Sequence, residues 1–163
     1  MPTTDAVKSR NLSLQFNRLI PASSGEVFEA WTNPELMKAW FAPGNMTVPA
    51  MSRDLRPGGA FRIEMKGRLE AHCGEQPLGN DDPVIVAEGV YTRMVPGSRL
   101  AYTWAGSWNP AEQSNVSVSL FDVAAGTALT LDHDGIESEQ SLQVHESGWQ
   151  SSLGKLYGMF ARN

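Results

Sequence analysis

The chain has 163 residues and a mass of 17.8 kDa, a length at which one domain with a sizeable core is expected. Hydrophobic residues make up 41% of it, including five Trp, six Phe and three Tyr, which excludes a disordered chain. The formal net charge is −5, and the 13 Lys and Arg residues form no run, so the basic footprint of a nucleic-acid-binding protein is missing.

The sequence carries no sign of secretion or membrane insertion. Residues 1–10 are polar and charged, without the apolar core of a signal peptide, and no stretch reaches the roughly 18 apolar residues of a membrane span. Cys73 is the single cysteine, which excludes an intramolecular disulfide. We therefore expect a cytoplasmic protein with a flexible tail over residues 1–10 and one domain over residues 11–163.

The N-terminal part of the chain predicts one strand and two short helices. Leu12–Ile20 alternates apolar and polar residues, which is typical of a strand with one buried face. Ser23 or Ser24 can cap a helix that follows and buries Trp31 in the core. Pro34 is placed to begin a second helix, because its missing N–H is not needed at a first helical position.

Period-two patterning dominates the middle of the chain. Strands are predicted over residues 47–54, 59–67, 83–95, 98–105, 114–123 and 126–134. Tight connections at residues 94–97 and 124–126 favour an antiparallel meander. The segment 67–82 contains Gly and Pro, and we expect it to be a mobile surface loop, with a cover over a pocket entrance as the alternative.

The period changes to 3.6 from about Glu139 onward. An apolar stripe recurs there at intervals of three and four residues, through Leu142, His145, Trp149, Leu153, Leu156 and Phe160. A helix with such a stripe needs a partner, and the concave face of a curved sheet is the only large one available. The sequence therefore predicts an α+β helix-grip fold, in which a curved antiparallel β-sheet wraps around a long C-terminal α-helix and two short helices follow the first strand.

Four motifs, in a fixed order along the chain, resemble one protein family. They are Phe28–Pro34, Lys38–Phe41, the Pro-Gly-Gly turn within Asp54–Arg62, and Gly148–Trp149. Over about residues 12–160 the chain resembles the activators of the heat-shock-protein-90 ATPase in their stand-alone bacterial form, within the START-like or SRPBCC superfamily. The resemblance implies a helix-grip domain with a pocket, and it leaves the content of the pocket open.

The candidate binding residues are aromatic and apolar side chains expected on the inner side of the sheet and helix. Large rings can line a cavity for an apolar or aromatic ligand, although filling the core is their alternative role. Trp108 belongs to the same group of rings. The residues expected to bind a ligand are Trp40, Phe61, Ile63, Met65, Tyr91, Tyr102, Trp104, Val118, Leu131, His133, His145, Trp149 and Leu153.

His133 is the most informative polar residue, because strand alternation places it on the inner face with Leu131. The same alternation predicts no carboxylate beside it on that face. A buried neutral histidine needs partners for both ring nitrogens, so we expect a structural or ligand-orienting role for it and for His145. Tyr102 and Tyr91 are expected to orient a ligand together with His133.

Three functions fit these features. The first is non-catalytic binding of a small, largely apolar or aromatic molecule by a carrier, sensor or sequestering stress-response protein. The resemblance implies the second, co-chaperone-type regulation of the heat-shock-protein-90 ATPase. The third is a cyclase- or dehydratase-like enzyme that uses His133 for acid–base chemistry.

No cofactor is expected. No metal site is expected either, because His72 and Cys73 are adjacent in the sequence and lack the spacing of paired metal ligands. We expect a monomer or homodimer.

Overall fold

The structure is a computed structural model that describes residues 11–67 and 83–161. The predicted flexible tail and most of the predicted loop at 67–82, with His72 and Cys73, lie outside these ranges. The elements follow in the order β1 (Leu12–Ile20), α2 (Ser24–Thr32), α3 (Pro34–Trp40), β2 (Thr47–Arg53), β3 (Ala60–Lys66), β4 (Val84–Val95), β5 (Arg99–Gly106), β6 (Asn109–Val123), β7 (Gly126–Ile136) and α4 (Glu139–Ala161).

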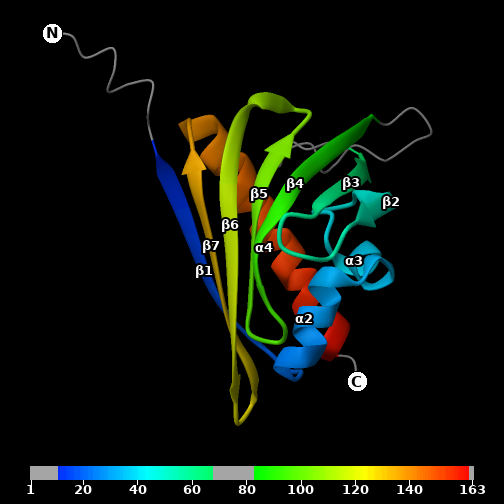
Figure 1. Ribbon diagram of the computed structural model, residues 1–163, viewed down its shortest axis with the longest axis vertical. Helices are drawn as coiled ribbons and strands as arrows, with labels where there is room; N and C mark the ends of the chain where they lie inside the picture. Colours follow the sequence, from blue (N-terminus) through cyan, green and yellow to red (C-terminus); the bar gives the residue numbers. More distant parts are fainter. Residues whose placement is uncertain (1–10, 68–82, 162–163) are drawn as a thin grey trace, which may run out of the picture.

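The seven described strands form one antiparallel sheet in the order β1-β7-β6-β5-β4-β3-β2. The sheet is curved, and the long helix α4 crosses one of its faces (Figure 1). The short helices α2 and α3 lie at one end of the sheet, near the C-terminal end of α4 (Figure 1). The α+β helix-grip prediction is therefore confirmed.

Strand alternation decides which side chains face α4. Along β5, Leu100, Tyr102 and Trp104 are buried while their neighbours are more exposed. Helix α4 buries a stripe that recurs every three or four residues, through Ser141, His145, Trp149, Ser152, Leu153 and Leu156. The predicted stripe is less buried at its two ends, where Leu142 and Phe160 are partly buried, and Phe160 packs against the core.

The short helices begin where the sequence predicts. Ser23 caps α2 by accepting a hydrogen bond from the Glu26 N–H at 3.2 Å, and the Glu26 carboxylate accepts one from the Ser23 N–H at 2.9 Å. Asn33 caps α3 by accepting from the Glu35 N–H at 3.0 Å, with Pro34 as the first helical residue. These reciprocal bonds fix the path by which the chain reaches α3.

The Pro-Gly-Gly turn docks on the neighbouring strand β4. The Gly58 N–H donates to the Tyr91 carbonyl at 2.7 Å, and the Tyr91 N–H donates to the Gly59 carbonyl at 3.0 Å. Gly58 has a φ of 86°, and a Cβ on Gly59 would lie 2.0 Å from the Asp54 carbonyl oxygen. The turn thereby fixes the start of β3, where Phe61 enters the core.

Helix α4 holds the loop that follows α3. The Ser152 hydroxyl donates to the Phe41 carbonyl at 2.7 Å, and the Lys155 ammonium donates to the Ala42 carbonyl at 2.6 Å. Burial lowers the pKa of Lys155 from its ordinary value. These bonds keep Phe41 and the following loop against the middle of the helix.

Two strands are longer than predicted. Strand β6 begins at Asn109 instead of residue 114, and β7 continues to Ile136 instead of residue 134. Gly106 pairs with Asn109, so the connection between β5 and β6 is a tight turn that contains Trp108. The added length of β6 brings Glu112 to the inner face of the sheet.

Candidate functional site

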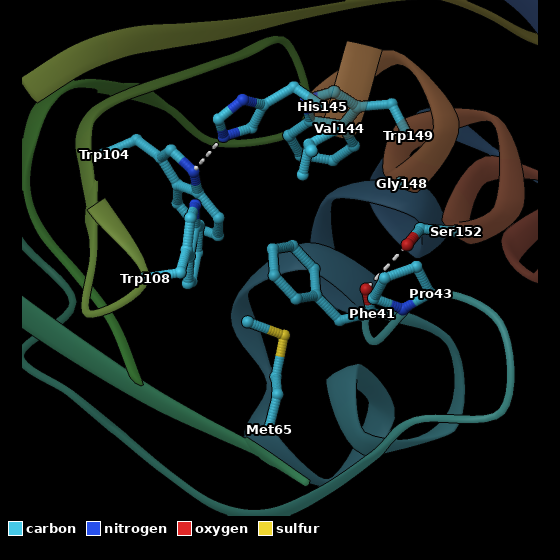
Figure 2. Close-up of a pocket in the computed structure, with 10 residues that line it drawn as sticks. All are labelled: Phe41, Pro43, Met65, Trp104, Trp108, Val144, His145, Gly148, Trp149 and Ser152. Atoms are coloured by element: carbon cyan, nitrogen blue, oxygen red, sulfur yellow. Dashed lines mark hydrogen bonds between the residues drawn. The ribbon is translucent and has the colours of Figure 1, made fainter. Parts of the chain in front are cut away.

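A cavity of about 50 Å³ lies between the sheet, the middle of α4 and the loop after α3 (Figure 2). Aromatic and apolar side chains dominate its wall, and the polar side chains on it come from α4. The wall consists of Phe41, Pro43, Met65, Trp104, Trp108, Val144, His145, Gly148, Trp149 and Ser152.

The structure distributes the predicted binding residues over three places. The cavity wall contains Met65, Trp104, His145 and Trp149. A smaller void of about 10 Å³ has Phe61, Ile63, Tyr91 and Tyr102 on its wall. The remaining predicted residues are buried in the core and line neither space; they are Trp40, Val118, Leu131, His133 and Leu153. Ligand binding by any of these residues stays a prediction.

Several residues of the cavity wall were not among the predicted binding residues. Val144, Gly148 and Ser152 follow one another at intervals of four and form the ridge of α4 beside Trp149, so helical spacing from the Gly148–Trp149 motif could have found them. Pro43 carries no such signal, because only the folded loop brings it to the helix.

His133 joins the two sides of the core by hydrogen bonds. The Trp149 indole N–H donates to Nδ1 of His133 at 3.0 Å, so Nε2 carries the ring proton and donates to the Ser114 hydroxyl oxygen at 2.8 Å. The ring is completely buried, and burial lowers its pKa to about 3, with the neighbouring His145 acting in the same direction. His133 is a neutral imidazole with both nitrogens in use.

His145 is held in the opposite tautomer. Its Nδ1–H donates to the Ser141 carbonyl at 2.8 Å, and its Nε2 accepts from the Trp104 indole N–H at 3.1 Å (Figure 2). Burial lowers the pKa of His145, while the Ser141 carbonyl and the Glu112 charge oppose the shift. The His145 and His133 rings meet edge to face with centroids 4.7 Å apart. Both histidines therefore orient tryptophan rings, as neutral partners.

Glu112 is a buried carboxylate that the sequence analysis missed. It is 5% exposed, and its two oxygens accept from the Glu137 N–H at 2.8 Å and from the Ser141 hydroxyl at 2.7 Å. The absence of a carboxylate had been predicted only beside His133, and Glu112 lies instead at Ser141, next to His145. Counting the alternation of β6 back from Val116 would have reached Glu112, had the strand not been started at residue 114.

Replacing Glu112 with alanine is expected to lower the free energy of unfolding by about 1–2 kcal/mol, because the buried Ser141 hydroxyl and the partly buried Glu137 N–H lose their acceptor. Urea unfolding followed by tryptophan fluorescence measures the loss. Gln113→Ala, at the exposed neighbouring position, is the matched control and should change stability by less than about 0.5 kcal/mol. Equal effects of the two variants would contradict a role for the Glu112 carboxylate in supporting the histidines.

The two predicted tyrosines lie at the smaller void, apart from the main cavity. The Tyr102 hydroxyl accepts from the Trp31 indole N–H at 3.2 Å, and Trp31 is a core residue, as predicted. Burial raises the pKa of Tyr91 to about 12 and that of Tyr102 further. Both tyrosines are therefore neutral near pH 7, with Tyr102 already engaged inside the protein.

The structure also bears on metals and membranes. Within residues 11–67 and 83–161, no three His, Cys, Asp or Glu side chains are grouped so that they could hold a metal ion. In the same part of the chain, no helix has the length and apolar character needed to span a membrane.

Solved structures of bacterial proteins have this fold. Protein CV1439 from Chromobacterium violaceum matches with a TM-score of 0.76 at 21% identity, over 91% of this chain and 97% of that chain. SA2116 from Staphylococcus aureus, a protein of unknown function, matches with 0.71 at 22% identity, over 96% and 97%. CalU16 from Micromonospora echinospora matches with 0.63 at 29% identity, over 91% and 74%.

A search of curated proteins found no match. The model of one protein family, described as Activator of Hsp90 ATPase homolog 1-like protein, matches residues 21–161 and so covers most of the chain. These residues include all four motifs on which the resemblance was based. The chain therefore belongs to the family of Activator of Hsp90 ATPase homolog 1-like proteins.

Proposed function

We propose that this protein binds a small, largely apolar or aromatic molecule between its sheet and α4 and catalyses no reaction on it. The observation that carries the proposal is the character of the cavity wall. Its rings and apolar side chains face an unfilled space, while the polar atoms of His145 and the hydroxyl of Ser152 already have partners inside the protein. Such a wall favours a ligand by removing apolar surface from water.

The expected affinity is moderate. Burial of about 200 Å² of apolar ligand surface contributes about 5 kcal/mol before the losses of association are subtracted. By itself this contribution corresponds to a dissociation constant of about 0.2 mM, so a micromolar constant requires at least about 3 kcal/mol more from further apolar burial and polar contacts. This affinity suits a carrier, a sensor or a sequestering protein.

The absence of catalysis in this proposal rests on the state of the histidines. His133 is fully buried, and each of its ring nitrogens has a partner within the protein, so it cannot reach a substrate in the cavity. Regulation of the heat-shock-protein-90 ATPase stays a prediction that the family description supports. The cytoplasmic location and the monomeric or homodimeric state also stay predictions from the sequence.

Filling the cavity from α4 tests the proposal. Gly148 lies on the wall, where an added Cβ would meet Pro43 at 3.9 Å, whereas an added Cβ on Gly154 meets nothing within 4 Å. We expect Gly148→Leu to weaken binding of the uncharged fluorescent probe N-phenyl-1-naphthylamine by at least about tenfold, as a loss of roughly 1.4 kcal/mol would do. Gly154→Leu should bind the probe as the wild type does, because Gly154 does not line the cavity. The two substitutions change helix propensity alike, so their difference measures the effect of filling the cavity.

Native mass spectrometry of the gently purified protein gives an independent result. A reproducible bound molecule that is reduced in Gly148→Leu and retained in Gly154→Leu would support the proposal and identify the ligand class. Equal probe binding by both variants, or no probe binding and no adduct in the wild type, would overturn it. Preserved binding of the chaperone by Gly148→Leu would show that any chaperone contact is separate from the cavity.

A further inference from the structure

A second hollow lies beside the cavity, over the first turn of α4. Its volume is about 320 Å³, and it shares Trp108 and Val144 with the wall of the first cavity. The rest of its lining is polar and uncharged, from Asn109, Ser138, Gln140 and Ser141. The two spaces are thus adjacent, with one tryptophan and one valine lining both of them.

The first cavity is too small to hold an aromatic ligand by itself. A dry protein cavity of about 150 Å³ holds one benzene molecule, whereas the first cavity measures about 50 Å³. Ligand sites commonly measure about 300–1,000 Å³, and the second hollow falls in that range. An aromatic ligand can therefore enter between the sheet and α4 only if a residue of the cavity wall moves.

Trp108 is the shared wall that can move. All five tryptophans lie in the described part of the chain, and four of them donate their indole N–H to protein acceptors, namely Trp31, Trp40, Trp104 and Trp149. Trp108 makes no such bond to any described residue and is only partly buried. Displacing its ring therefore breaks no internal hydrogen bond of the indole, unlike displacement of the other four.

The turn that carries Trp108 is anchored, so the side chain can move while the backbone stays. The Ser107 N–H donates to the Val86 carbonyl at 2.8 Å, and the Val86 N–H donates to the Ser107 hydroxyl at 2.9 Å. The indole lies over Gly106, where an added Cβ would be 2.3 Å from the ring. Gly106 thus makes room for the present position of the ring.

The charges around the two spaces select the kind of ligand. No Lys or Arg is among the described residues that line either space. The buried carboxylate nearby belongs to Glu112, which is bonded to Ser141 on the wall of the second hollow. An anionic ligand would leave water without gaining a cationic partner, which is costly.

We propose that the cavity and the second hollow form one elongated site for an uncharged aromatic ligand, with the Trp108 side chain as the movable partition between them. The inference rests on the proposed function and adds the ligand class and the residue that controls entry. When the ring lies between the two spaces, the site is closed to ligands larger than the first cavity. When it swings away from Gly106, the ligand reaches Trp104 and Trp149.

Two substitutions and two probes test the inference on the full chain. Gly106→Ala displaces the Trp108 ring without removing it, and Trp108→Ala removes the partition. Both should bind N-phenyl-1-naphthylamine about 3- to 10-fold more tightly than the wild type and associate with it faster, because the open state no longer has to be populated first. The sulfonated analogue 8-anilino-1-naphthalenesulfonate should bind the wild type at least about tenfold more weakly than the uncharged probe, in line with the desolvation of its charge.

The outcomes separate this inference from the proposed function. If the wild type binds the uncharged probe and Gly148→Leu blocks it, but Gly106→Ala and Trp108→Ala leave the affinity unchanged or weaken it, Trp108 is a fixed wall and the partition is overturned. Equal affinity for the two probes would overturn the uncharged class. If no variant binds either probe, the proposed function itself fails. Gly154→Ala, with open space around its added Cβ, is the control for both affinities.

Discussion

Replacing His133 with alanine is expected to lower the free energy of unfolding by about 3–5 kcal/mol. The ring is completely buried, so its removal leaves a cavity in the core between β7 and α4. It also leaves the Trp149 indole N–H without its acceptor and removes one of the two partners of the Ser114 hydroxyl. A buried donor without an acceptor costs about 1–3 kcal/mol by itself. The cavity and the unpaired donor therefore both lower the free energy of unfolding.

Urea unfolding of His133→Ala and Trp149→Phe, singly and combined, measures this effect and the coupling between the two side chains. The combined loss should be smaller than the sum of the single losses by about 0.5–3 kcal/mol, because each single substitution breaks the same hydrogen bond. Asp134→Ala, at the exposed next position of β7, serves as the control. A loss below about 1 kcal/mol for His133→Ala would contradict a structural role for the ring.

Acidification from pH 7 to pH 5 is expected to destabilise the protein by about 2 kcal/mol through His133, with His145 adding to the loss in the same direction. The pKa of each ring is lowered in the folded state from an ordinary value of 6.5, and that of His133 lies at about 3. Below pH 6.5 the unfolded chain therefore binds protons that the folded protein does not. The contribution of the histidines to the free energy of unfolding is fully present above pH 6.5. Below that pH it falls by about 1.4 kcal/mol per pH unit for each such proton.

Unfolding free energies at half-unit pH intervals between 7.5 and 5 measure the slope, in a His72→Gln background so that His133 and His145 are the remaining histidines. His145→Gln should reduce the slope by up to one proton, since an amide can accept from the Trp104 N–H but does not titrate in this range. A flat profile in the parent would show that neither pKa is lowered in the folded protein, and an unchanged slope in His145→Gln would show this for His145 alone.

The buried hydrogen bonds hold part of the cavity wall in place. His133 and His145 fix the rings of Trp149 and Trp104 by accepting their indole N–H groups, so two cavity walls are held in place from behind. Glu112 supports His145 through Ser141. Trp108 has no such partner among the described residues, which leaves one wall that can respond to a ligand. Rigid and movable walls thus meet at the same space.

The sequence predicted most of the fold because the signals for it are local. Alternation in β5 and the 3.6-residue period of α4 identify buried faces, and the caps Ser23 and Asn33 mark helix starts. The errors occurred at element ends, where local signals are weak. Because the strand was predicted to begin at residue 114, Glu112 fell outside it. In the structure, the alternation of buried and exposed residues along β6 includes Glu112 as a buried position.

The sequence by itself determined the helix-grip fold, the family and the aromatic character of the inner face, because periodicity and short motifs carry that information. Only the tertiary structure decided which rings surround empty space. Whether a tryptophan fills the core, as Trp40 does, or lines a cavity, as Trp104 does, depends on packing between segments far apart in the chain. The same packing gives both ring nitrogens of His133 a hydrogen-bond partner and leaves the Trp108 indole N–H without an acceptor among residues 11–67 and 83–161, because such partners are set by three-dimensional distance and not by sequence position.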